Sequence, residues 1–222
     1  MSLAHLTAKN PDVAKAFAAR DRQQLLSLLR PGYGALNELY GVEQFHFHVP
    51  PATSFLRLHA PERYGEEMAS FRPTIVQVEK TGKSVSGIEV GVFGMSIRGV
   101  APVYYENEQI GTVEVGLSLG ESFLQEFKAS YGSELAVYVA EGEEEKKPKV
   151  FAATRGSASL SPDQFKRSFV QGEAVLQTSM SDGRDVAIIT GPVADYSSRI
   201  IAVVEISVDR SPTLALLTKY AS

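Results

Sequence analysis

The sequence predicts an α+β protein in which a long N-terminal helix precedes two tandem modules, each a five-stranded antiparallel sheet with covering helices. Three observations predict this fold. Apolar residues recur at three- and four-residue spacings up to about Gly41, short alternating runs follow, and one order of strands and helices then occurs twice. With 44% hydrophobic residues, a chain of 222 residues can build a packed core in one large or two small domains.

The first 41 residues have the spacing of a helix. Asn10 is a suitable cap before Pro11, which fits a first helical turn, and Asp12 is favoured at a helix N-terminus. Proline interrupts helices, so Pro31-Gly32 is expected to break or kink the run about two-thirds of the way along.

The first module is predicted over residues 42–120. Its expected strands are 44–49, 53–59, 85–93, 96–106 and 109–119. Pro50-Pro51-Ala52 forms a tight connection and residues 106–108 a hairpin turn. Between the second and third strands, residues 62–70 and 73–80 are expected to be helical or irregular.

The second module is predicted over residues 121–210 with the same order of elements. Helices are expected at 121–131 and at 162–170, the latter capped by Ser161, and strands at 135–140, 149–154, 173–180, 184–196 and 200–208. Expected turns are GEEEKKP, Asp182-Gly183 and Ser197-Ser198, and an apolar helix at 213–220 ends the chain. A faint residue-level repeat supports the duplication, because Val113-Glu114-Val115 corresponds to Val204-Glu205-Ile206.

One face of the first strand pair is predicted to be cationic or titratable. His46 and His48 alternate with apolar residues, and Arg57 and His59 do the same on the next strand. An unpaired buried charge is costly, so this face requires a counter-ion from the protein or from a ligand.

Composition excludes several classes of function. A net charge of −4 without a cluster of Lys and Arg argues against a nucleic-acid partner. The absence of cysteine excludes disulfides, thiolate metal sites and thiol nucleophiles. No apolar stretch approaches 18 residues and no signal peptide is visible, so the chain as given is expected to be soluble.

Known catalytic and cofactor motifs are also missing. The glycines of GIEVGVFGMSIRG match neither a dinucleotide-binding nor a phosphate-binding loop, and they lie within a strand pattern, where bulges are common. No GxSxG sequence occurs. We therefore expect no cofactor and no enzymatic activity.

The candidate ligand site combines arginines, histidines and tyrosines. Guanidinium groups bind carboxylates through paired donors, and histidine and tyrosine side chains supply hydrogen bonds. The candidate ligand-binding residues are Arg57, Arg72, His48, His59, Tyr105, Arg98, Tyr64 and His46. In the alternative interpretation, the arginines form a structural network at the rim with Glu62, Glu66, Glu67, Glu89 or Glu114, and the tyrosines pack in the core or at the rim.

A metal site is a further alternative for the histidines. His46, His48 and His59 have side chains that can ligate zinc, because residues two apart on a strand share a face. No HExxH motif and no second cluster of ligands accompanies them, so hydrogen bonding to a carboxylate or to the backbone is the favoured interpretation and no metal is assigned.

Residues 45–119 carry a family resemblance. The runs SFLRLHAPERYG, Phe71-Arg72 and GIEVGVFGMSIRGVAPVYYENEQIGTVEVGL resemble the double-Cache extracellular sensor domain of bacterial chemoreceptors and sensor kinases. The resemblance is weaker in the second half, where it rests on the repeated strand order. It implies two PAS-like modules, the first distal and the second proximal to a membrane, with residues 1–41 as a stalk helix and residues 211–222 as a helix leading to a membrane span.

The resemblance also implies a function. It indicates the periplasmic part of an inner-membrane receptor, a methyl-accepting chemotaxis protein with a histidine kinase or cyclic-nucleotide enzyme as alternatives, homodimeric and held by flanking spans absent from this chain. The family's usual amino-acid-binding signature is not evident, so the expected ligand is a short carboxylate such as acetate, bound in the distal module. Closure of residues 64–71 over the ligand would then shift the terminal helices.

Two other classes of function remain open on the sequence alone. One is a periplasmic metal-binding or hydrolytic domain built on His46, His48 and His59. The other is an interaction module without a ligand, whose helices only dimerise. Metal content separates the first from a sensor, and ligand-dependent thermal stabilisation separates the second.

Overall fold

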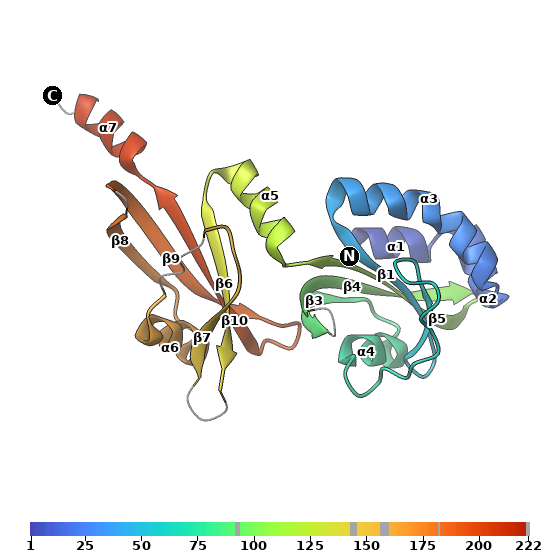
Figure 1. The fold of residues 1–222 in the computed structure, drawn as a ribbon. Coiled ribbons are helices and arrows are strands. Elements are labelled where there is room, and N and C mark those ends of the chain that lie inside the picture. Colours follow the sequence, from blue (N-terminus) through green and yellow to red (C-terminus); the bar gives the residue numbers. More distant parts are fainter. Residues whose placement is uncertain (92–93, 143–145, 156–159, 182, 221–222) are drawn as a thin grey trace. The chain divides into compact units, whose positions relative to one another are not determined.

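The structure, a computed structural model, divides the chain into two compact units, Met1–Ser118 and Leu119–Ser222 (Figure 1). It describes residues 1–91, 94–142, 146–155, 160–181 and 183–220. The parts of the predicted turns at residues 143–145 and Asp182, and the predicted strand end at residues 92–93, lie outside these ranges.

The first unit contains three helices, a five-stranded sheet and a fourth helix between its second and third strands. In order these are α1 (Ser2–Ala8), α2 (Pro11–Ala18), α3 (Arg22–Tyr40), β1 (Val42–Val49), β2 (Thr53–Arg57), α4 (Pro73–Thr81), β3 (Val85–Gly91), β4 (Gly94–Tyr105) and β5 (Glu108–Ser118). The strands pair antiparallel in the order β2-β1-β5-β4-β3. Residues 62–70, expected to be helical or irregular, are irregular.

The N-terminal helical region is three helices, so the prediction of one long helix broken at Pro31-Gly32 is wrong. The first interruption comes at Asn10, whose side chain accepts hydrogen bonds from the backbone of Asp12 and Val13, as the cap pattern predicted. The second comes at Arg20, which has a positive φ of 56°, before Asp21 caps α3. Helix α3 continues through Pro31, which costs one backbone hydrogen bond, so the caps rather than the proline divide the region.

The sheet of the first unit has one face packed on helices and one face turned toward the candidate site. Helices α1, α2 and α3 lie over one face and α4 lies on the other (Figure 1). Under the N-terminal helices, Phe45 and Phe47 of β1 pack with Phe17 of α2, and all three side chains are buried. The residues that alternate with these phenylalanines, His46 and His48, therefore occupy the other face.

The second unit repeats this plan without the N-terminal helices. Its elements are α5 (Glu121–Tyr131), β6 (Glu134–Glu141), β7 (Lys147–Ala153), α6 (Pro162–Gln171), β8 (Val175–Ser181), β9 (Arg184–Ala194), β10 (Ile200–Asp209) and α7 (Ser211–Tyr220). The strand order β7-β6-β10-β9-β8 matches that of the first sheet element by element. The predicted fold class of two five-stranded antiparallel modules is therefore confirmed.

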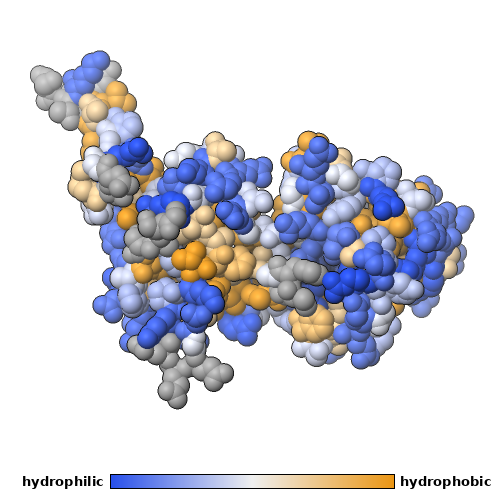
Figure 2. All heavy atoms as spheres, viewed as in Figure 1, coloured by the Kyte–Doolittle hydropathy of each residue, from blue (hydrophilic) through white to orange (hydrophobic). Residues whose placement is uncertain are grey.

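Local signals position α6 over the second sheet. Ser161 and Gln164 form the reciprocal capping box at its start. The side chain of Phe165 is fully buried against Tyr138 and Val203, so it attaches the helix to the sheet. The last helix, α7, carries the exposed leucines Leu214, Leu216 and Leu217, and hydrophobic residues, in orange, are visible on it in Figure 2. Across the described ranges, no helix is both long enough and apolar enough to span a bilayer.

Candidate functional site

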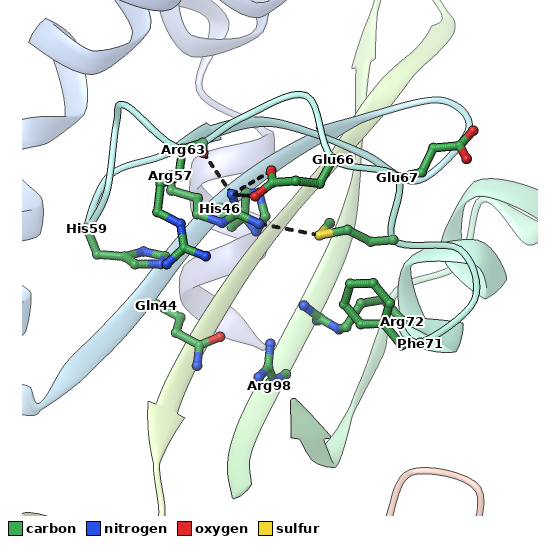
Figure 3. Close-up of a pocket in the computed structure, with 11 residues that line it drawn as sticks. Gln44, His46, Arg57, His59, Arg63, Glu66, Glu67, Phe71, Arg72 and Arg98 are labelled. Atoms are coloured by element: carbon green, nitrogen blue, oxygen red, sulfur yellow. Dashed lines mark hydrogen bonds and ion pairs between the residues drawn. The ribbon is translucent and has the colours of Figure 1, made fainter. Parts of the chain in front are cut away.

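A cavity of about 270 Å³ opens on the face of the first sheet opposite the N-terminal helices (Figure 3). Strands β1, β2 and β4 supply one side of it, and the connection between β2 and α4 supplies the other. The lining residues are Gln44, His46, Arg57, His59, Arg63, Glu66, Glu67, Met68, Phe71, Arg72 and Arg98. The alternation on β1 and β2 explains this lining, because Arg57 and His46 are direct cross-strand partners on one face.

Two of the lining arginines are anchored in a buried ionic cluster. Arg72 pairs with Glu114 through Nη2 and with Glu89 through Nε at 2.9 Å, and Arg98 Nη1 lies 2.7 Å from Glu114 Oε1. All four residues are at most 5% exposed. Thr74 also donates to Glu89, so this carboxylate has further support from the start of α4. The alternative interpretation of a structural network therefore holds for Arg72 and Arg98, although the cluster is buried rather than at the rim.

The charges of this cluster balance, which explains how it tolerates burial. Burial alone would raise the pKa of the Glu114 carboxyl, but the positive charges of Arg72 and Arg98 outweigh that effect and lower the pKa to about 2. The same carboxylates raise the pKa of Arg72 against the effect of its burial. Arg72 and Glu114 are therefore both ionised at neutral pH.

Arg57 is held differently, by the irregular connection that crosses the cavity. Its Nη1 donates to the backbone oxygen of Arg63 at 2.7 Å and to both oxygens of Glu66, at 2.8 and 3.0 Å (Figure 3). Its Nη2 has the sulfur of Met68 as partner at 3.6 Å, and sulfur is a weak acceptor. Unlike Glu114, Glu66 is 44% exposed in its side chain.

The ion pairs do not exhaust the donors of these guanidinium groups. Each guanidinium carries five N–H donors. Within the described part of the chain, Arg72 uses Nε and Nη2 and Arg98 uses Nε and Nη1, which leaves one terminal nitrogen of each without a hydrogen-bond partner. Together with Nη2 of Arg57, the cavity therefore offers three nitrogens with donors that an acceptor can reach.

The histidines of this face form a neutral, hydrogen-bonded group. The rings of His46 and His48 lie 4.0 Å apart, His46 Nε2 lies 2.8 Å from Ser54 Oγ, and His48 Nδ1 lies 2.9 Å from Thr112 Oγ1. Burial holds the pKa of both imidazoles well below 6.5. The next largest cause is the neighbouring imidazole of His48 for His46, and the positive charge of Arg72 for His48. Burial and Arg57 also lower the pKa of His59. The positive charge of this face therefore comes from the arginines.

Three of the predicted site residues lie away from the lining. His48 is on the predicted face but is fully buried beneath it, and its Nε2 has no hydrogen-bond partner in the described ranges. Tyr64 is 55% exposed and its ring lies under the guanidinium of Arg22, 3.5 Å from the ring centroid. Tyr105 packs against the core under the N-terminal helices, on the other face of the sheet. The packing alternative thus describes Tyr105.

Several lining residues were absent from the predicted set. Gln44 lies two positions before His46 on β1, so the alternation that identified His46 also places Gln44 on the cavity face. Met68 and Phe71 come from the irregular connection, where no periodic signal exists. The pairing role of Glu66 depends on where that connection crosses the sheet.

The arrangement gives little support to a metal centre. Across the ranges that the structure describes, no group of three or more His, Cys, Asp and Glu side chains is placed to hold a metal ion. The rings of His46 and His59 are 6.5 Å apart, and His46 and His48 each direct a nitrogen at a hydroxyl group. The cavity is suited to hydrogen bonding of a small polar molecule through guanidinium, imidazole and amide groups.

Comparison with known families gives a match over nearly the whole chain. A family model described as a double sensory domain of two-component sensor kinases (dCache_3) matches residues 1–213. A comparison with curated protein sequences gave no match.

Solved structures with the same fold include sensory domains from several bacteria. A domain of a sensory box/GGDEF family protein from Vibrio parahaemolyticus has a TM-score of 0.56 at 10% identity and covers 94% of this chain and 87% of its own. The sensor domain of the histidine kinase DctB from V. cholerae has a TM-score of 0.52 at 13% identity, with coverage of 93% and 87%. The ligand-binding domain of the Pseudomonas fluorescens chemoreceptor CtaA, in complex with L-serine, has a TM-score of 0.50 at 16% identity, with coverage of 94% and 87%.

Proposed function

The chain belongs to the double sensory domain family of two-component sensor kinases, and on that premise we propose that it is the ligand-sensing part of a transmembrane receptor. The site that we propose is the cavity of the first unit, and the ligand class is a small organic acid such as acetate. The proposal places the domain outside the cytoplasm and gives it no catalytic activity of its own. A metal-binding or hydrolytic function is not favoured, because the family and its structural neighbours are sensory.

One observation carries the ligand class. Three guanidinium groups, those of Arg57, Arg72 and Arg98, converge on one cavity of about 270 Å³, and each keeps a terminal nitrogen with spare or weakly used donors. A carboxylate accepts several such bonds at once, and guanidinium geometry favours it over other small acceptors. His46, His59 and Gln44 supply further hydrogen bonds from the same face of the sheet.

An amine on the ligand is a second possibility that the charges favour. Four arginines line the cavity, and four glutamates balance their charge. Glu66 and Glu67 also line the cavity, and Glu89 and Glu114 pair with the lining residue Arg72. A simple acid adds one negative charge to this neutral set, whereas an amino acid adds none and brings an ammonium group for Glu66 or Glu67. CtaA was solved with amino acids, so amino acids belong in the ligand panel.

The contact of α1 with the sheet supports signalling through a terminal helix. Arg98 faces the cavity, and a Cβ built on the next residue, Gly99, would lie 2.8 Å from the backbone nitrogen of Met1, the residue that precedes α1. Helix α1 itself packs against β4. A small movement of β4 on ligand binding therefore reaches α1 directly. A ligand shifts the receptor only if it prefers one position of this helix over the other.

The output module and the assembly are further parts of the proposal. We propose a methyl-accepting chemotaxis receptor that is homodimeric and anchored by membrane spans outside this chain, and a histidine kinase is the competing output, which the family description favours. The residues that flank this segment in the full gene product test both. A coiled-coil methylation region would support the first output and a kinase core the second.

Titration of the purified domain tests the proposed site. We expect acids of a panel of acetate, propionate, lactate and succinate, or amino acids such as L-serine and L-leucine, to raise the melting temperature of the wild-type chain by mass action. We expect Arg57→Gln to weaken that binding at least about tenfold, because a charged hydrogen bond is lost. Unchanged affinity in this variant would remove Arg57 from the site, and a panel without any binder would refute the ligand class.

A further inference from the structure

The acidic side chain of Glu66 occupies the position at Arg57 where a ligand carboxylate would bind. Both carboxylate oxygens of Glu66 lie within 3.0 Å of Nη1 of Arg57, and Figure 3 shows the Glu66 side chain directed at this guanidinium across the cavity. The Arg57 hydrogen bond also lowers the pKa of the Glu66 carboxyl, so Glu66 is ionised at neutral pH. An anionic ligand and Glu66 would therefore compete for the same group.

The backbone around Glu66 is fixed, which limits what can move. The backbone N–H of Ser54 donates to the Glu66 oxygen at 2.9 Å, the N–H of Gly65 donates to the Ser54 oxygen at 2.8 Å, and the N–H of Met68 donates to the Ala52 oxygen at 2.9 Å. These bonds attach residues 65–68 to the edge of the sheet beside β2. The Glu66 side chain can leave Arg57 by rotation while its backbone stays in place.

Exposure separates Glu66 from the other carboxylates that pair with arginines of the cavity. Glu89 and Glu114 have side chains at most 6% exposed and would remain buried and unpaired if a ligand displaced them, which is costly. The Glu66 side chain is 44% exposed and can be solvated on leaving. The neighbouring Glu67 also lines the cavity, but its side chain points away from Arg57 in Figure 3.

We propose that Glu66 is a specificity-determining residue, an internal carboxylate that a ligand must displace from Arg57. Glu66 would then set the affinity of the site and require the ligand to carry a negative charge, because a neutral molecule cannot replace it at the guanidinium. This inference rests on the proposed function, since it concerns the same cavity and the same class of ligand. It differs from closure of residues 64–71, because only one side chain exchanges partners.

Replacement of the competing charge tests this proposal. Acetate and succinate are titrated calorimetrically into the wild-type chain, Glu66→Gln and the matched control Glu67→Gln, with acetamide as a neutral probe. We expect Glu66→Gln to bind acid about two- to fivefold more tightly than wild type, the range that loss of a part-exposed ion pair permits. Glu67→Gln should stay within about twofold, because it removes the same charge without freeing Arg57. Acetamide should not bind the wild-type chain or Glu67→Gln, because a neutral molecule cannot displace Glu66 from Arg57.

The outcomes separate this inference from the proposed function. Acid binding to the wild-type chain with equal or weaker binding to Glu66→Gln would overturn the role of Glu66 and leave the ligand site in place. An equal gain in Glu67→Gln would assign the effect to net charge and also overturn it. Acid binding to neither the wild type nor Glu66→Gln would refute the ligand class, and this inference with it. If Glu66→Gln melts earlier than wild type, Glu66→Asp, which keeps the charge on a shorter side chain, should show a gain between the two.

Discussion

At the scale of single residues, the arginines of one sheet face have two different roles. Arg72 and Arg98 are buried and are held by carboxylates that are equally buried, whereas Arg57 is held by a carboxylate with access to water. A buried pair is costly to break, and a part-exposed pair is not. The pairing therefore divides a set of similar side chains into a structural cluster and an exchangeable contact.

This division predicts different effects on stability. We expect Arg72→Ala to lower the free energy of unfolding by about 3–5 kcal/mol, because it leaves Glu89 and Glu114 buried without their main partner. Arg57→Ala, the control, should cost about 1 kcal/mol or less from its ion pair, because Glu66 remains hydrated. Urea denaturation of both variants measures this. Equal losses would contradict the distinction, and a ligand test that relies on Arg72→Ala would be confounded by unfolding.

The pH dependence of stability follows from the same residues. His46 and His48 have pKa values well below 6.5 in the fold, mainly through burial, so the unfolded chain binds protons that the folded chain excludes. Stability is then complete above pH 6.5 and falls as the pH is lowered, by about 1.4 kcal/mol per pH unit for each histidine once the unfolded chain is protonated. Denaturation curves between pH 7.5 and 5 measure this slope.

A variant and a second pH range check that assignment. His48→Gln should lower the slope between pH 6.5 and 5, and an unchanged slope would exclude His48 as a source. Glu114 contributes in a lower range, because its pKa of about 2 in the fold lies below its ordinary value of 4.5. Its share of stability is present above pH 4.5 and is lost as the pH falls toward 2, with a total of about 3 kcal/mol.

At the scale of elements, two glycines differ in whether their surroundings have room for a side chain. Gly111 of β5 has a φ of 154°, and a Cβ built on it would clash with the backbone oxygen of His48 and lie 2.7 Å from the Phe17 ring. Position 111 therefore has a backbone conformation that residues with a side chain rarely adopt, and it has no room for a Cβ. Gly34 lies in α3 with nothing within 4 Å of such a Cβ.

Alanine at these two positions should change stability in opposite directions. We expect Gly111→Ala to destabilise the fold by at least about 2–3 kcal/mol, through overpacking against the core and backbone strain. Gly34→Ala should stabilise it by about 0.5–1 kcal/mol, because alanine loses less conformational entropy in a helix. Thermal melts of the two variants are the measurement. A tolerated Gly111→Ala would mean that α2 and β1 do not meet this strand as closely as described.

At the scale of the whole molecule, the chain is two consecutive units with separate cores. Among the described residues, every strand pairing lies within one unit, and the buried cluster around Phe17 and the one around Phe165 are each built from one unit alone. The candidate site is likewise built only from the first unit. Contiguous segments with their own cores fold by themselves in many proteins.

We therefore expect residues 1–118 to fold cooperatively and to bind acids with the affinity of the full chain. A cooperative urea transition and calorimetric titration of this piece are the measurements, and residues 119–222, which lack the site, are the control without binding. Acid binding that requires both halves would show that the first unit does not hold the site alone.

The sequence by itself determined the order of elements, the duplicated sheet and the face on which His46 and Arg57 lie, because these depend on periods of two or about four residues read along the chain. Asn10 and Ser161 were predictable caps for the same reason. The predicted break at Pro31-Gly32 failed where packing and capping outweighed one proline.

Only the tertiary structure decided which cations are neutralised and which remain exchangeable. The partners Arg57 and Glu66, Arg72 and Glu89, and Arg72 and Glu114 are 9, 17 and 42 residues apart, so strand register and the course of an irregular connection bring them together. No local sequence pattern encodes which of these side chains meet in the fold, or the depth at which each pair is buried. The charge of the site is therefore a property of the fold, while the face that carries it is a property of the sequence.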